Sequence, residues 1–226
     1  STEQLIAWFD IADINKSAAR YAFKKLDDLN GHYIRQTDNA ELLTHIKGML
    51  PHLDFASLRA MEIDPKAPPR ADVALAHEVL AQLPDVSSGK ELAERFATAG
   101  WDKLAAAVPS LKERAKTLAE LVQGALYLVA RRPLSLDAKA AKLIDDDARA
   151  TFKALLSRFE AAPEWNAAAL EALVKNYAEE TGAKLGKVAQ PLRAALTGRS
   201  VSPPVFDVMA VLGREEAIAR ISDCAA

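Results

Sequence analysis

The chain has 226 residues, and its 29 Lys and Arg against 31 Asp and Glu give a formal net charge of −2. This charge excludes the strongly basic balance of a non-specific nucleic-acid binder, so any RNA contact must use local basic patches. Half of the residues are hydrophobic and only 9 are glycine, a composition that favours helix over sheet. The single cysteine, Cys224, excludes an internal disulfide and suits a cytoplasmic protein, and no apolar run reaches the roughly 20 residues of a membrane span.

The first half of the chain shows a series of short helices separated by turn signals. Apolar residues at helical spacing predict helices over residues 5–9, 42–50, 73–83 and 92–96, the last of them ended by Gly100. Another helix is predicted over residues 23–29, where Asn30-Gly31 gives a stop signal. The three prolines within residues 64–70 predict a loop.

A capping box is predicted at Ser110, because a serine there is followed three residues later by Glu113. It would open a helix whose apolar face includes Leu118 and Leu126. The Arg131-Arg132-Pro133 stretch interrupts the helical pattern and predicts a domain boundary.

The second half continues with helices. Phe152 and Phe159 share the face of one helix, and Pro163 and Asn166 start the next, which Gly182 ends. Two further helices are predicted over residues 191–197 and 203–212, each begun by proline and ended by glycine. No alternating strand pattern competes with these assignments. The sequence therefore predicts an all-α fold, with two consecutive helical-bundle lobes over residues 38–134 and 135–226 that follow a short helical segment over residues 1–37.

No residue pattern indicates catalysis or metal binding. The four histidines lack a cysteine or carboxylate set at ligand spacing, and solvated helix histidines are the ordinary alternative. Asp145-Asp146-Asp147 is better explained by the favourable interaction of carboxylates with a helix N-terminus. Neither a phosphate-binding glycine loop nor a nucleophile elbow is present.

Three polar sites are each predicted to fall near the start of a helix: Arg114 after the capping box, Arg193 after Pro191, and Ser202 as an N-cap. Helix N-termini have unpaired N–H groups and a partial positive charge, and arginine adds a planar fork for base edges. Ordinary alternatives remain open. Lys112, Arg114 and Lys116 would equally suit a solvated face, Arg193 a pairing with Glu171 or Glu179, and residues 202–204 a capped turn.

Two segments resemble the C-terminal part of bacterial glutamyl-tRNA synthetases. The first is FDIADINKSAARYAFKKLDDLNGHYIR over residues 9–35, with its core at Asn15-Lys16-Ser17 and at residues 29–35. The second covers residues 165–221 and includes QPLRAALTG at 190–198 and LGRE at 212–215. Together they cover somewhat over a third of the chain. Between them the match is weak but in order, and it includes residues 112–118.

The resemblance implies two anticodon-binding helical domains, residues 38–134 and 135–226, after the end of a stem-contact region. It implies that Arg114 reads the last anticodon base. It places four residues beside Arg193 in the anticodon pocket: Ser202, Pro203, Pro204 and Val205. We add as candidate phosphate contacts Lys112, Lys116, Lys187 and Arg199. The chain departs from the family at Ala22 and Pro204, and residues 51–97 are longer than usual.

The family's H-I-G-H-type and K-M-S-K-S-type signatures are absent from the sequence. The chain therefore looks like a C-terminal fragment or a stand-alone relative, and alone it is expected to be catalytically inactive and to hold no cofactor. By resemblance, ATP and Mg belong to the catalytic domain of the parent class I enzyme. The expected partner is a glutamate-accepting tRNA, with a glutamine-accepting one left open, and neither DNA nor a membrane is expected. The chain is expected to be a cytoplasmic monomer. The alternative hypotheses are a helical scaffold that binds a protein and a small helical enzyme.

Overall fold

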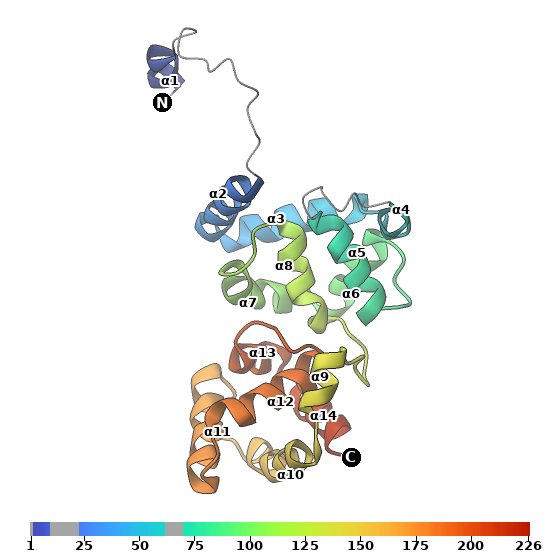
Figure 1. Cartoon of the computed structure of the whole chain (residues 1–226), viewed down its shortest axis with the longest axis vertical. Helices are drawn as coiled ribbons and strands as arrows, with labels where there is room; N and C mark the ends of the chain where they lie inside the picture. The colour runs from blue at the N-terminus through green and yellow to red at the C-terminus, as the bar shows by residue number, and fades with distance from the viewer. Residues whose placement is uncertain (1, 10–22, 62–69) are drawn as a thin grey trace.

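A computed structural model describes residues 2–9, 23–61 and 70–226. Every regular element in this part of the chain is a helix, and none is a strand, so the all-α prediction is confirmed (Figure 1). The loop predicted over residues 64–70 and the Asn15-Lys16-Ser17 motif lie almost entirely outside the described residues. Helix α1 (Thr2–Trp8) precedes the two lobes.

The first lobe contains the helices from α2 to the short 3-10 helix η3. Their bounds are α2 (Phe23–Gln36), α3 (Asn39–Met49), η2 (Leu50–His52), α4 (Phe55–Ala60), α5 (Ala71–Gln82), α6 (Gly89–Ala99), α7 (Trp101–Lys112), α8 (Leu118–Ala125) and η3 (Leu126–Leu128). Helix α5 packs on α4 and α8, and α3 packs on α7. Phe55, Phe96 and Leu104 are among the fully buried side chains of this lobe.

The second lobe contains the remaining helices. Their bounds are α9 (Ala138–Leu143), α10 (Asp146–Glu160), α11 (Ala167–Thr181), α12 (Leu185–Thr197), α13 (Val205–Leu212) and α14 (Arg214–Ala225). Helix α10 packs along α14, and α11 packs on α12 and α13. Asn166 caps α11 and Gly182 ends it in the left-handed conformation, as the sequence predicts. Asp145 caps α10, so the three aspartates stand at a helix start.

The predicted stop at Asn30-Gly31 is wrong, because α2 continues through both residues to Gln36. The reason is tertiary contact. Gly31 faces the α7–α8 turn, where an added Cβ would be in ordinary van der Waals contact with Lys116 Cγ and the Ala115 carbonyl oxygen, at 3.5 and 3.6 Å. Asn30 donates a side-chain hydrogen bond to the Lys116 carbonyl at 2.5 Å. These residues therefore form a helix contact instead of a helix end.

The predicted capping box at Ser110 is also wrong. Ser110 lies inside α7, whose buried face continues through Pro109 to Leu111. The helix that carries Leu118 and Leu121 begins seven residues later, at a second S/T-x-x-E sequence. There Thr117 Oγ1 accepts a hydrogen bond from the Glu120 N–H at 3.1 Å, and the Glu120 carboxylate accepts one from the Lys116 N–H at 2.7 Å.

The two proline-started helices differ from their predictions at the beginning, although both end at the predicted glycines, Gly198 and Gly213. Helix α12 begins at Leu185 and contains Pro191 in its interior. Burial of Val188 and Leu192 on one face, across the proline, offsets the missing N–H hydrogen bond. Helix α13 begins at Val205 without a side-chain cap, so Ser202 is not its N-cap.

The two lobes share one continuous hydrophobic core, which extends from Ile34 to Ala225. Helix α7 of the first lobe packs directly on α13 of the second. Figure 1 shows the lobes stacked along the long axis. The chain crosses between them once, through the crossing segment over residues 129–137, between η3 and α9. The predicted boundary at 134/135 falls in this crossing segment and stays a prediction. Among the described helices, none is long and apolar enough to cross a membrane.

Candidate anticodon-binding cleft

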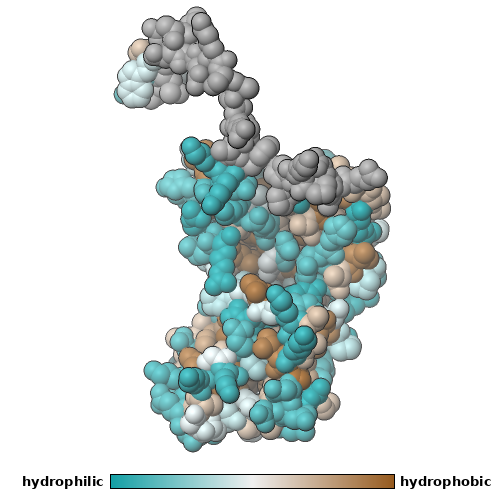
Figure 2. All heavy atoms as spheres, viewed as in Figure 1, coloured by the Kyte–Doolittle hydropathy of each residue, from teal (hydrophilic) through white to brown (hydrophobic). Residues whose placement is uncertain are grey.

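A cleft of about 450 Å³ lies at the junction of the two lobes. Its volume is within the range of roughly 300–1,000 Å³ that is typical of small-ligand sites. The junction cleft is lined from both lobes by Glu78, Gln82, Leu111, Arg114, Gln123, Gly124, Asp137, Lys139 and residues 199–203. Figure 2 shows that polar side chains cover much of the viewed face of both lobes, with separate apolar patches near the junction.

Arg114 projects from the first lobe into this cleft. It follows the end of α7, in the turn before α8, so the prediction that it lies in the first turn of a helix is wrong. Its side chain is exposed, and Nη1 donates a hydrogen bond to the Ser202 carbonyl oxygen of the second lobe at 3.3 Å. No carboxylate pairs with Arg114 within the described residues, and the exposed guanidinium has further N–H donors available.

Arg193 approaches the same carbonyl from the second lobe. It lies two turns inside α12 and not at its start, because the helix passes through Pro191. Its Nη1 donates to the carbonyl of Ser202 at 2.8 Å, to the Ser202 hydroxyl at 2.9 Å and to the Pro203 carbonyl at 2.9 Å. Neither Glu171 nor Glu179 pairs with it. Burial, and then the like charge of Arg114, lowers the pKa of Arg193.

The loop over residues 198–204 connects α12 to α13 and forms one wall of the cleft. Gly198 begins it with φ of 71°, and a Cβ there would lie 2.5 Å from the Ser135 carbonyl oxygen. Only glycine therefore fits this conformation and this close approach. The Gly198 carbonyl accepts a hydrogen bond from the Asp137 N–H at 3.0 Å. The loop is thus attached to the segment that joins the lobes.

Asp137 connects this loop to the start of α9. Its carboxylate accepts hydrogen bonds from the N–H groups of Lys139 and Ala140 at 2.8 and 2.7 Å, and from the Ser200 N–H at 3.4 Å. Burial alone would raise the pKa of Asp137, but these three donors and nearby Arg199 together lower it below its ordinary value. The carboxylate therefore stays charged and keeps its position in the cleft wall.

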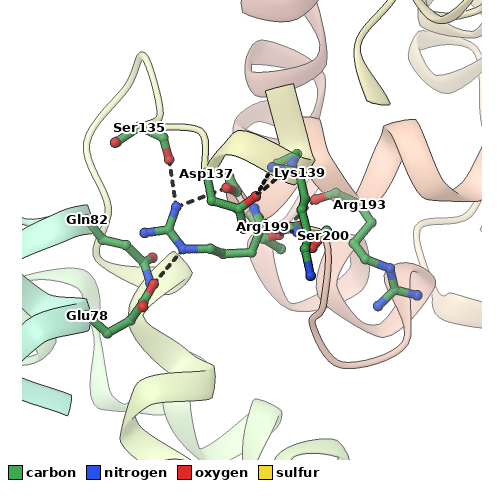
Figure 3. A network of polar contacts seen from close by, with 11 residues as sticks. Glu78, Gln82, Ser135, Asp137, Lys139, Arg193, Arg199 and Ser200 are labelled. Atoms are coloured by element: carbon green, nitrogen blue, oxygen red, sulfur yellow. Dashed lines mark hydrogen bonds and ion pairs between the residues drawn. The ribbon is translucent and has the colours of Figure 1, made fainter. Parts of the chain in front are cut away.

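Arg199 extends in the opposite direction to Arg193, towards the first lobe (Figure 3). Its Nε donates to Glu78 Oε1 of α5 at 2.5 Å, and its Nη1 donates to the carbonyls of Ser135 and Gly198, each at 3.0 Å. The Arg199 side chain is only 15 % exposed. Its predicted role as a phosphate contact stays a prediction, and the structure gives its guanidinium three partners within the protein.

The three lysines predicted to contact phosphate have different surroundings. Lys112 Nζ donates to the Thr37 carbonyl at 3.2 Å, and Lys116 Nζ forms an ion pair with Asp28 at 2.8 Å. Lys112 therefore attaches the end of α7 to the turn after α2, and Lys116 attaches the turn after α7 to α2 itself. The side-chain hydrogen bond and charge of Asp28 raise the pKa of Lys116. Lys187 is exposed in the first turn of α12 and has no partner within the described residues.

The predicted pocket residues after Ser202 are only partly accessible. Pro204 is exposed, whereas Pro203 is buried and Val205 is 4 % exposed in the core of the second lobe. Sequence reasoning missed Val201, which is 76 % exposed beside Ser202, and exposed Lys139 on α9. Neither has a motif that reveals it. Val201 could have been found only because it is next to Ser202 in the sequence, and no sequence feature indicates Lys139.

The cleft lining combines cationic side chains (Arg114, Lys139 and Arg199) with the carboxylates of Glu78, Glu120 and Asp137, and Arg193 contacts this lining through Ser202. Arg114 and Arg193 converge on one carbonyl, and neither has a carboxylate partner in the part of the chain that the structure describes. Lys139 and Gln123 add donors on the other walls. Such a site can accept an unstacked base, bind its edge through the arginine fork and hold a neighbouring phosphate.

The all-helical fold of the described residues is matched by a known family. Residues 73–225 match the family model described as "Anticodon binding domain", so this protein is a member of that family. Curated relatives narrow the match further. The chain is 48 % identical over 223 residues to "Glutamate--tRNA ligase 2" of Brucella ovis and equally to "Glutamate--tRNA ligase 1" of Brucella melitensis. These alignments cover 99 % of the chain and 40 % of each relative.

Solved structures show the same fold. The glutamate tRNA ligase of Elizabethkingia meningosepticum, solved in complex with its amino acid, matches with a TM-score of 0.63 at 21 % identity, over all of this chain and 36 % of that one. The glutamate-tRNA synthetase of Elizabethkingia anophelis matches with a TM-score of 0.57 at 21 % identity. At this identity the comparison concerns the fold alone.

Proposed function

We propose that this chain recognises the anticodon of a glutamate-accepting tRNA on behalf of a glutamate–tRNA ligase. The observation that carries the proposal is the convergence of Arg114 and Arg193 on the Ser202 carbonyl in a cleft between two lobes. The family match and the 48 % identity to glutamate–tRNA ligases support it. ATP-dependent glutamylation, with ATP and Mg, belongs in this proposal to a catalytic region outside the chain. In this proposal the chain alone is catalytically inactive.

In the proposed mechanism, residues 38–134 and 135–226 act as two anticodon-binding domains around the junction cleft. The anticodon bases are unstacked, because single-stranded loops expose base edges that a helix hides. Arg114 donates from its free guanidinium nitrogens to the edge of the last base. Arg193 holds the wall formed by Ser202, Pro203, Pro204 and Val205 in place, and Lys187 contacts the backbone outside the cleft.

The experiment is binding of the chain to anticodon stem-loops with single-base changes, measured by fluorescence anisotropy. Wild-type protein should discriminate against a wrong base by about 1–3 kcal/mol, by analogy with bidentate contacts to DNA bases. Arg114→Ala should lose this discrimination at one anticodon position only. Arg158→Ala is the matched control, because that arginine pairs with Glu180 on the surface, outside the cleft lining. Equal losses on every stem-loop would refute the role of Arg114.

Salt dependence separates this function from a protein-binding scaffold. Contacts to phosphates release counterions, so the observed affinity for the stem-loop should fall steeply between about 50 and 200 mM salt. An apolar groove that binds a protein would respond weakly to the same change. A shallow slope for wild-type protein would therefore favour the scaffold hypothesis.

A further inference from the structure

An ion pair between Arg199 and Glu78 links the two lobes at the edge of the junction cleft. The residues are 121 positions apart in sequence, and Nε and Oε1 lie 2.5 Å apart. The Arg199 side chain is 15 % exposed and that of Glu78 is 27 % exposed. Partial burial weakens screening by solvent and salt, so this pair holds its geometry better than an exposed one.

Both partners are held by further hydrogen bonds. Gln82 Nε2 donates to the same Glu78 oxygen at 2.9 Å, one turn along α5. Arg199 Nη1 donates to the carbonyls of Ser135 and Gly198 at 3.0 Å. The guanidinium therefore joins three parts of the molecule: helix α5, the crossing segment and the 198–204 loop (Figure 3).

The same loop meets the first lobe again only three residues later, where Ser202 accepts the hydrogen bond from Arg114. Arg199 thus fixes one end of this short stretch and Arg114 contacts the other. A rotation of the lobes that lengthened the Arg199–Glu78 contact would also move Ser202 away from Arg114. The Arg199–Glu78 pair therefore adds a polar contact at the cleft edge to the α7–α13 packing that already joins the lobes.

We propose that Arg199 is a positioning residue for anticodon recognition, which acts through Glu78 by setting the separation of the two cleft walls. This inference rests on the proposed function of the cleft. It replaces direct phosphate binding by Arg199 with an indirect effect on specificity. Because α7 also packs on α13, loss of the pair should loosen the junction without separating the lobes.

The first test compares Glu78→Gln, Arg199→Gln and the double variant in stem-loop binding. Each single variant should narrow discrimination between correct and wrong bases about fivefold. Arg199→Gln also removes the contacts to the Ser135 and Gly198 carbonyls, so it should lose at least as much as Glu78→Gln, and the double variant should lose no more than Arg199→Gln. The salt slope should be unchanged throughout. Arg158→Gln serves as the control ion-pair variant.

Phosphate binding by Arg199 would give a different pattern. Arg199→Gln would then weaken all stem-loops alike and lower the salt slope by about 0.7, while Glu78→Gln would leave the affinity unchanged or raise it. That result would overturn the proposal.

A second measurement needs no RNA. Spin labels on Cys at Ala97 of α6 and Lys153 of α10, in a Cys224→Ser background, report the distance between the lobes. Glu78→Gln and Arg199→Gln should broaden the distance distribution, whereas Arg158→Gln should not. Unchanged distance distributions in folded variants would contradict the proposal that the Arg199–Glu78 pair sets the separation of the cleft walls. A different result is that wild-type protein fails to discriminate between stem-loops although the two variants broaden the distance distribution. In that case the proposed function is wrong, and the role of the Arg199–Glu78 pair in holding the lobes is supported.

Discussion

Arg114 and Ser202 are 88 residues apart in the chain, yet Nη1 of one donates a hydrogen bond to the carbonyl oxygen of the other at 3.3 Å. Arg193 donates to that same oxygen at 2.8 Å. A single carbonyl of the second lobe therefore brings together two arginines, one from each lobe. Their positive charges remain without a carboxylate within the described residues, and this is the electrostatic basis of the proposed site.

The 198–204 loop should be sensitive to any side chain at its first residue. Gly198→Ala combines left-handed backbone strain with a clash against the Ser135 carbonyl, so it should lower the free energy of unfolding by more than about 2 kcal/mol. Gly182→Ala has the same backbone strain with nothing within 4 Å and should cost about 1 kcal/mol. Urea denaturation compares the two. Equal losses would mean that contact with Ser135 contributes nothing.

The start of α8 gives a second comparison. Thr117→Ala removes the hydroxyl that accepts from the Glu120 N–H and should destabilise the chain by about 0.5–2 kcal/mol. Ser110→Ala removes a hydroxyl that donates to Ala107 within α7 and should change stability by less than about 0.5 kcal/mol. Thermal unfolding of both variants decides between the two capping boxes. A larger effect at Ser110 would contradict the observed helix start.

Helix ends were more predictable from sequence than helix starts. Gly182, Gly198 and Gly213 stop their helices as predicted, because the positive φ they adopt is a local property of glycine. Pro191 does not start a helix, because a buried face that continues across it outweighs the local rule. A local sequence pattern can therefore be followed, as at the three glycines, or overridden, as at Pro191, and burial of the surrounding side chains decides which occurs.

The sequence predicted some residues of the candidate site correctly as neighbours, but it gave the wrong structural reason for their proximity. Arg114, Arg193 and Ser202 do meet, but through carbonyl contacts and not at helix starts. The pairing of Arg199 with Glu78 has no local signal, because 121 residues separate them. Contacts of this kind depend on how the lobes pack, which a reading of one sequence does not provide.

Asp137 predicts a specific acid dependence of stability. Its folded-state pKa lies below the ordinary value of 3.8, so its contribution to stability is complete above that value and is lost as the pH falls through the folded pKa. The difference in unfolding free energy between wild type and Asp137→Asn should therefore shrink below about pH 4. Urea titrations from pH 7 to pH 3 measure it. A difference that stayed constant over this range would contradict the account.

Lys187 tests the contribution of phosphate contacts outside the cleft. It is exposed on α12 with no partner within the described residues, so Lys187→Ala should weaken every stem-loop alike and lower the salt slope by about 0.7. Lys153→Ala, an exposed lysine on α10, should change neither. Anisotropy titrations at several salt concentrations give both slopes. Base-dependent losses in Lys187→Ala would argue for a contact within the anticodon instead.

The central claim, that the anticodon enters the junction cleft, is tested most directly by photocrosslinking. An anticodon stem-loop with 4-thiouridine at a single anticodon position is bound, irradiated and digested, and the crosslinked peptides are identified by mass spectrometry. The account predicts crosslinks to the 198–204 loop and to the turn that carries Arg114. Crosslinks confined to other surfaces, such as α10 or α11, with none in the cleft, would contradict it.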